Sequence, residues 1–247
     1  MALTQVPNEL LEIGVKAFGT SSFMIGDTTT GTIDAANYNT GVGVDVFESL
    51  STGDRNTAIG FASMDANTTG SDNTAVGNHT LGANTTASCN VALGSSALTA
   101  NTEGGNNVGL GCDALVANTT ASNNTAVGTS ALAANTTGTR NTAVGSRGLI
   151  VVTTGNDNTA VGYNAGQATT TASNCTFIGN SAGNENTTAN DNTAVGYSAL
   201  LLTTTGNENV AVGKASLQDN TTGTSNCAVG TESLEDNTTG VGNTGLG

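Results

Sequence analysis

Few residues in this sequence could do chemistry, and their spacing keeps them apart. The single histidine, His79, could act as a base or metal ligand, and Cys89, Cys112, Cys175 and Cys227 could bind a metal or form disulfides. The cysteines show neither Cys-x-x-Cys nor Cys/His metal spacing, which predicts four free thiols. We interpret His79 as a solvated substitution. The sequence therefore predicts no catalytic residue, no cofactor or metal site, and a protein that is not an enzyme.

A weak cation site is the other chemistry that the pattern allows. Acidic side chains directly precede an asparagine that recurs through the chain, and carboxylate oxygens bind hard cations. Arg55 and Arg140 stand at the same place, so we favour a solvated edge of mixed charge. The acidic members of this group are Asp72, Asp157, Asp191 and Glu208.

The composition argues against an ordinary enzyme and against anionic partners. The 247 residues include 34 glycines, one proline, no tryptophan and only 3% aromatic residues. Five basic residues against 19 acidic ones give a formal charge of −14, which disfavours nucleic acid as a partner. The sequence contains no run of 18 apolar residues and no signal-peptide pattern. We therefore expect no membrane insertion, and assembly in a cytoplasm.

A 17-residue repeat organises most of the chain. Rows of 17 that start at Asn39 give 12 full rows and five residues of a thirteenth, without insertion or deletion. Position 5 of the row is always glycine, from Gly43 to Gly247, which predicts a positive φ or a close backbone approach once per row. We expect residues 39–247 to form one repeat domain and residues 1–38 to form an N-terminal attachment and capping region.

Positions 2 to 4 of each row alternate as in a β-strand. Position 2 is mostly Thr or Val, position 3 is Ala or Gly except at Phe177, and position 4 is Val, Ile or Leu. We expect the aliphatic column at position 4 to be buried in the coil and the Ala/Gly column to face a neighbouring backbone. A second large apolar column, at position 9, begins at Phe47 and is expected to fill the same core from the opposite wall. Only Gly166 and Gly183 interrupt it, and Phe177 is expected to fill the space that they leave.

The row length selects the fold class. A period of 17 is too short for a strand–helix or two-helix unit, and β-branched residues, Gly and Asn disfavour helix. The sequence predicts an all-β protein, a parallel β-solenoid or β-roll with 17-residue coils about 4.8 Å apart. The Asn-Thr-Thr-Gly segments, as at 67–70, are expected to form turns. Asparagines at position 1 either stack their amides in a ladder along the rod or only favour a turn.

The predicted core is thin, which favours association of several chains. Two large aliphatic side chains per coil are few for 17 ordered residues. We therefore expect the Ala/Gly face to be buried between chains in an intertwined or side-by-side homotrimer, a closed assembly rather than an open filament. Replacing Ala126 or Ala143 with Leu is then expected to block assembly before it disturbs the coil.

The row resembles known tandem repeats. The strings NTAVG, NTAIG and NVAVG, followed by SAL and NTTG, resemble repeats of phage tail fibres and related virion appendages over residues 39–247. They are also similar to the SVAIG repeats of trimeric autotransporter adhesin heads, which implies a trimeric left-handed parallel β-roll. The opening VPN at residues 6–8 resembles the start of many phage fibre subunits.

The resemblance implies a structural component of a phage virion. This would be a trimeric fibre or appendage, on tail or capsid, that gives rigid reach and contact with a host-surface receptor. Its location would be the virion, and residues 1–38 would bind other virion proteins.

Two other functions remain open. One is an adhesin or receptor-binding head, in which the variable pair after each glycine, for example Asn78–His79 or Ser146–Arg147, contacts the receptor. The other is an ice-binding solenoid, suggested by Thr columns such as Thr68 and Thr69. Adjacent residues point to opposite sides of a strand, so only one of these two columns would face outward.

Overall fold

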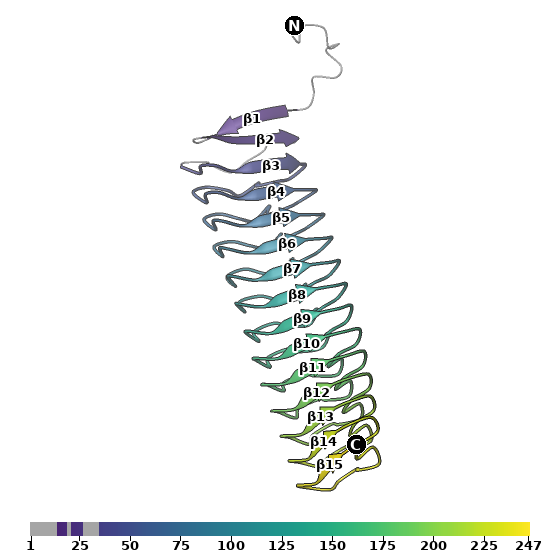
Figure 1. Cartoon of the computed structure of the whole chain (residues 1–247). Helices are drawn as coiled ribbons and strands as arrows, with labels where there is room; N and C mark the ends of the chain where they lie inside the picture. The colour runs from purple at the N-terminus through teal and green to yellow at the C-terminus, as the bar shows by residue number, and fades with distance from the viewer. Residues whose placement is uncertain (1–13, 19–20, 27–34) are drawn as a thin grey trace, which may run out of the picture.

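The computed structural model describes residues 14–18, 21–26 and 35–247. Within these residues the regular structure is a single sheet of fifteen short strands in sequence order, drawn in Figure 1. The strands are β1 (Gly14–Phe18), β2 (Ser22–Gly26), β3 (Thr40–Gly43), β4 (Thr57–Ile59), β5 (Thr74–Val76), β6 (Val91–Leu93), β7 (Val108–Leu110), β8 (Thr125–Val127), β9 (Thr142–Val144), β10 (Thr159–Val161), β11 (Thr176–Ile178), β12 (Thr193–Val195), β13 (Val210–Val212), β14 (Cys227–Val229) and β15 (Thr244–Leu246).

The strands confirm the predicted parallel β-solenoid. From β2 onward each strand pairs in parallel with the next, and the paired residues are 17 apart, as in Thr125↔Thr142. The chain therefore advances by one strand per row and builds a rod about 60 Å long at the usual strand spacing. The in-register stack already begins at β2, where Phe23 pairs with Thr40, one row before Asn39.

The N-terminal end of the sheet is an antiparallel hairpin. Strand β1 pairs with β2 in antiparallel register, Gly14↔Gly26 to Phe18↔Ser22, so the parallel ladder ends there. The predicted attachment and capping region, residues 1–38, includes 1–13, 19–20 and 27–34, which lie outside the described residues. Its role in attachment stays a prediction.

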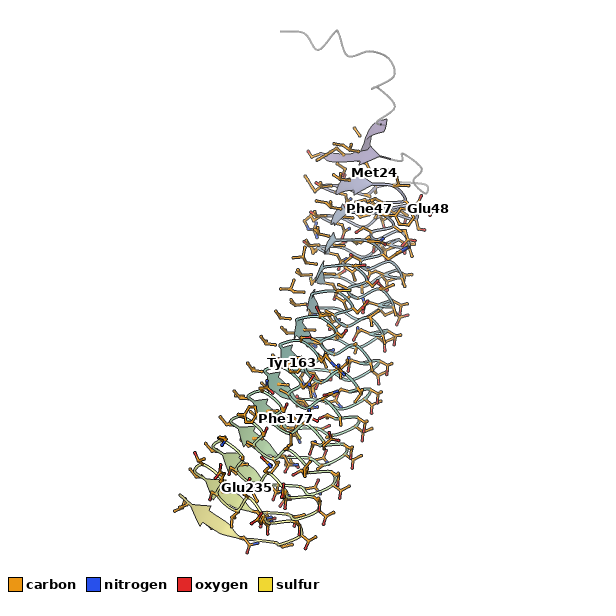
Figure 2. The ribbon with its side chains drawn as sticks, turned by 90° about the vertical axis from the view of Figure 1, so that its right-hand side faces the viewer. Met24, Phe47, Glu48, Tyr163, Phe177 and Glu235 are labelled. Carbon is orange, nitrogen blue, oxygen red and sulfur yellow. The ribbon has the colours of Figure 1, made fainter. Side chains whose placement is uncertain are left out.

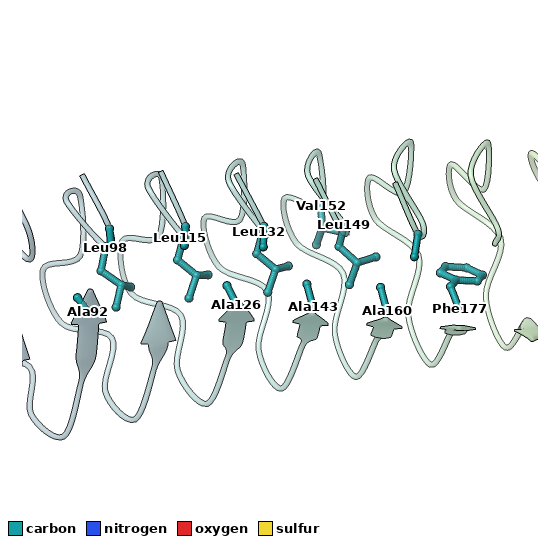
Figure 3. Close-up of a cluster of buried hydrophobic side chains, with 14 of the residues drawn as sticks. Ala92, Leu98, Leu115, Ala126, Leu132, Ala143, Leu149, Val152, Ala160 and Phe177 are labelled. Atoms are coloured by element: carbon teal, nitrogen blue, oxygen red, sulfur yellow. The ribbon is translucent and has the colours of Figure 1, made fainter. Parts of the chain in front are cut away.

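The inside and outside of the strands are the reverse of the expectation. Ala at position 3 is fully buried in the coil interior, as at Ala126 and Ala143, whereas the aliphatic residues at position 4 face outward. Leu132 at position 9 is also fully buried, and Figure 3 shows the Leu column lying against the Ala column. The predicted alternation is confirmed, but the predicted burial of position 4 and the placing of the Ala/Gly column between chains are wrong.

The reason is the width of the coil. The Leu side chains reach across the interior to the opposite strand, so that strand has space only for small inward side chains. A Cβ added to Gly41 would already lie 2.9 Å from Cγ of Met24 and 3.2 Å from Cδ2 of Phe47. The small residues that suggested close contact between chains are therefore explained by packing within one chain.

The invariant glycine at position 5 meets both predicted requirements. Gly128 has a φ of +133°, a region that side chains disfavour. A Cβ there would also fall 2.6 Å from the carbonyl carbon of Gly145 in the next coil. Any other residue at Gly128 would combine backbone strain with a clash against the neighbouring coil.

The position 1 asparagines form the ladder that the sequence left open. The backbone N–H of Asn56 donates to Oδ1 of Asn39 at 2.8 Å, and Nδ2 of Asn56 donates to the carbonyl of Gly70 at 2.9 Å. Both ends of each amide are thus satisfied inside the coil, which burial requires. The buried members are Asn39, Asn56, Asn73, Asn90, Asn107, Asn124, Asn141, Asn158, Asn192, Asn209 and Asn226.

A second asparagine ladder, at position 12, was not anticipated. Nδ2 of Asn118 donates to Oδ1 of Asn101 at 2.8 Å and to the carbonyl of Ala121 at 3.0 Å. The first residue of the Asn-Thr-Thr-Gly segment is therefore an interior ladder residue as well as a turn residue. Next to it, Thr136 Oγ1 donates to the carbonyl of Thr153 at 3.1 Å, and this bond also repeats along the rod.

Candidate interaction surface

The chemically capable residues are scattered along the rod, as expected from their different positions in the row. His79 is exposed and makes an edge-on contact with the ring of Phe61, at 5.3 Å between centroids. All four cysteines are free thiols, which confirms the prediction. Burial raises the pKa of the Cys175 thiol to about 11, so this thiol stays protonated and unreactive at neutral pH.

The acidic residues before the repeat asparagine lie on an exposed edge of mixed charge. The Arg140 guanidinium pairs with Asp157 at 2.6 Å, and Arg55 pairs with Asp72 at the same distance. The hydrogen bond from each Arg lowers the pKa of its Asp partner. Asp191 accepts a hydrogen bond from Asn174 in the preceding coil. These partners fit the solvated edge better than a ladder of cation sites.

No enclosed chemical site is found in the described part of the chain. No group of three His, Cys, Asp or Glu side chains converges as metal ligands would among residues 14–18, 21–26 and 35–247. The same residues enclose no pocket. Nor do they include a helix that is long and apolar enough to cross a bilayer. The candidate site is therefore a surface of the rod.

The surface that stands out is the outer face of the sheet, formed by the outward side chains at positions 2 and 4 of strands β3 to β15. The strand arrows follow one edge of the rod in Figure 2, and their side chains project from it. Large apolar side chains are accessible here: Ile59 is 38% exposed, Leu93 49% and Ile178 40%. Exposed aliphatic side chains recur at position 4 along the whole rod, whereas single scattered exposed apolar residues are the ordinary case on a soluble protein.

The outer face carries no charge, although the chain is strongly acidic. None of the 19 Asp and Glu residues lies in strands β3 to β15, and neither do any of the five Lys and Arg residues. The residues that give the formal charge of −14 therefore all lie outside these strands. The face therefore combines partly exposed apolar side chains with the absence of charged ones.

Comparison with protein-family models, with curated proteins and with solved structures found no match for this chain. The surface itself must therefore carry the functional argument.

The other two surfaces suggested by the sequence lie at the turns. Asn78, His79 and Arg147 in the variable pairs are exposed, and the same position exposes Tyr163 and Tyr197. In the Thr columns, Thr69 and its equivalents are exposed, whereas Thr68 Oγ1 donates to the carbonyl of Thr85 at 2.9 Å. One Thr column faces outward, as expected from the alternation of adjacent side chains.

Two features of these surfaces escaped sequence reasoning although a signal was present. Positions 2 and 4 never contain a charged residue in thirteen strands, which is compatible with burial against another chain as well as in a core. Position 12 is asparagine in most rows, and its regularity exceeds what a turn requires. Each pattern identifies an outer apolar face or an interior ladder only when the direction of its side chains, into the coil or away from it, is known.

Proposed function

We propose that this protein is a structural component of a phage virion, a homotrimeric fibre or appendage on tail or capsid that supplies rigid reach. The observation that carries the proposal is the uninterrupted ladder from β2 to β15, in which every coil bonds to the next at the same register. A rod of this kind transmits position and load along its length and needs no pocket or catalytic group. The repeat resemblance supplies the setting.

The rigidity has a specific physical source. Strand bonds and the threonine ladder link each coil to the next, and the two asparagine ladders add further bonds wherever asparagine occupies positions 1 and 12, as at Asn124, Asn118 and Thr119. Bending the rod must lengthen several of these bonds at once, which opposes flexing. The proposed role is therefore reach and stiffness without enzymatic activity, cofactor or metal.

The proposed partners come from the repeat resemblance and from the charge of the chain. Residues 1–38 attach the rod to other virion proteins, and further copies of the chain complete the trimer. The formal charge of −14 disfavours nucleic acid and anionic membranes, so neither is a proposed partner. The proposed location is the virion, after assembly in the host cytoplasm.

A receptor-binding head is the second candidate, favoured by the exposed aromatic residues beside the sheet. Phe61 is 46% exposed, Tyr163 50% and Tyr197 59%, and all three follow the glycine of their row. Aromatic side chains at such exposure are common in recognition surfaces. Binding of the purified rod to host cells that Tyr163→Ser and Tyr197→Ser together abolish would favour this function.

An ice-binding solenoid is the third candidate, because Thr69 and its equivalents form an exposed column. The neighbouring column is engaged in backbone bonds, which leaves one free row of hydroxyls on that wall. Thermal hysteresis in a solution of the purified chain is the measurement. Hysteresis would support this function, and its absence would eliminate it.

The fibre function is tested on particles. In immunogold electron microscopy, antibodies raised against residues 39–247 should label appendages on virions of the phage whose genome encodes this chain. The isolated chain should appear as straight rods. Labelling of infected host cells, without labelling of virions that are shown to be intact and complete, would contradict the proposal.

A further inference from the structure

We propose that the outer face of the sheet is the surface through which copies of this chain associate, side by side, parallel and in register. This inference deepens the proposed function, because it assigns the contact that holds the fibre together. It replaces the Ala/Gly column, which the fold buries inside each coil. The occupant of the face is a further copy of the same chain.

The first argument is the distribution of exposed apolar residues. Position 4 presents an aliphatic side chain in every strand from β3 to β15, and position 2 adds Val91, Val108 and Val210. In between stand Thr residues, whose methyl groups and short side chains pack well on a pleated surface. The result is one continuous apolar strip instead of isolated exposed residues.

The second argument is electrostatic. Two chains that each carry −14 repel each other when their acidic walls approach. The outer face is the wall on which the strands place no charged residue, so contact there keeps the acidic side chains of the two copies apart. A basic partner is disfavoured for the same reason, because the face offers no carboxylate to pair with.

The third argument is area. A strip about 60 Å long and about 10 Å wide has on the order of 600 Å², the upper end of what monomeric proteins leave exposed. In a closed threefold assembly each chain contacts two neighbours, and the two outward columns can face one neighbour each. In that arrangement the whole apolar strip is covered by neighbouring chains. The assembly is also closed, so it does not grow into an open filament.

The direction and register follow from the geometry of a rod. Three rods around a common axis are parallel by symmetry, and equivalent residues then lie at the same height. Every coil of shift between neighbours would leave one coil of apolar side chains uncovered at each end. Zero shift therefore buries the most apolar surface.

Cys227 is a natural reporter of this contact. It occupies position 2 of β14, on the outer face, and its equivalents would meet around the axis. A variant that retains Cys227 is made with Cys89→Ser and Cys112→Ser, while Cys175 stays because it is only 1% exposed. A short bismaleimide, which adds to two thiols, should then link copies through Cys227 at micromolar chain concentration.

The matched control keeps Cys89, which is exposed on another wall, and carries Cys112→Ser and Cys227→Val. Valine occupies the same column at Val210, so this change suits the face. The Cys89 variant should react with a monofunctional maleimide but form few linked dimers. Efficient linkage through Cys89 with none through Cys227 would overturn the proposed face while leaving a multi-chain fibre intact.

Orientation is tested with a second thiol at the opposite end of the rod. Thr40→Cys in β3, combined with Cys227→Val, places a thiol eleven coils from β14, a distance of about 53 Å. A parallel assembly links Cys227 variants among themselves and Thr40→Cys variants among themselves. Mixed linkage between the two variants, with no linkage within each, would show antiparallel packing and overturn the parallel arrangement.

A charge on the face should separate assembly from folding. Val144→Glu is expected to reduce the mass in light scattering from three chains to one while the far-UV circular dichroism is unchanged. Thr137→Glu is the control, because position 14 already carries a natural glutamate at Glu103. A wild-type mass of one chain at all concentrations would overturn self-association. If such a monomer showed thermal hysteresis, and Val144→Glu abolished it, the outer face would be an ice-binding surface instead.

Discussion

The ring of Phe177 occupies the space that a side chain at Gly166 would need. A Cβ on Gly166 would lie 2.7 Å from Cδ2 of Phe177 and 2.8 Å from Cδ2 of Leu149, and one on Gly183 would overlap the same ring. Figure 3 shows the ring in line with the leucine column. Strands β10, β11 and β12 keep their register around it. The predicted local repacking is therefore confirmed, and the parallel pairing of these strands is unchanged by it.

Removing this ring should destabilise the rod locally. Phe177→Ala is expected to cost about 3–5 kcal/mol of unfolding free energy, because it leaves a cavity that two glycines cannot fill. Denaturant unfolding measures the loss, and hydrogen exchange should place it in β10 to β12. Gly183→Leu should be destabilising in the wild type and partly restoring in Phe177→Ala. An unchanged melting profile of Phe177→Ala would contradict this account of the packing.

Repairing the second asparagine ladder should stabilise the protein. Val152 interrupts that ladder, and on either side Asn135 Oδ1 and Thr169 Oγ1 are buried without a hydrogen-bond partner. Val152→Asn would offer its Nδ2 to Asn135 and its Oδ1 to Thr169. We expect a gain of about 1 kcal/mol in unfolding free energy. The neighbouring exposed residue gives the control, Val151→Asn, which should change stability by less than about 0.5 kcal/mol. Equal effects of the two substitutions would contradict the ladder argument.

The invariant glycine column should tolerate no side chain. Gly128→Ala combines a φ of +133° with a Cβ 2.6 Å from the carbonyl carbon of Gly145. We expect it to cost at least about 3 kcal/mol, and thermal unfolding monitored by circular dichroism measures it. Gly242→Ala is the control, because its φ of +69° is close to the φ that Asp72 and Arg140 adopt at the same row position, and nothing lies within 4 Å of its Cβ. A similar loss in both variants would contradict the special requirement for glycine at position 5.

Stability should fall at alkaline pH because of Cys175. Its folded pKa is raised from 9.0 to about 11, so between these values the folded protein keeps a proton that the unfolded chain has lost. Unfolding free energy should therefore decrease as pH rises through this window, by about 3 kcal/mol, and level off above it. Cys175→Asn, which restores the residue found at this position in other rows, should remove this part of the decrease. An identical pH profile for both proteins would contradict the assignment.

The sequence by itself determined the repeat length, the strand positions, the glycine column and the parallel solenoid, because each of these is a periodic property that one chain displays directly. It also predicted the compensation between Phe177 and Gly166, since a loss and a gain of volume occur in adjacent rows. Alternation along a strand states which residues share a face. It does not state which face is inside, because both faces of these strands are free of charge.

Only the tertiary structure decided that point. The leucines at position 9 reach across a narrow coil, so the opposite strand accepts alanine inside and turns its larger residues outward, as at Ala143 and Val144. The buried asparagine at position 12 depended on the same geometry, since its amide is satisfied only where the coil above places the next one, as at Asn101 and Asn118. Which side of a strand is buried, and which polar groups can be buried with it, are properties of the closed coil.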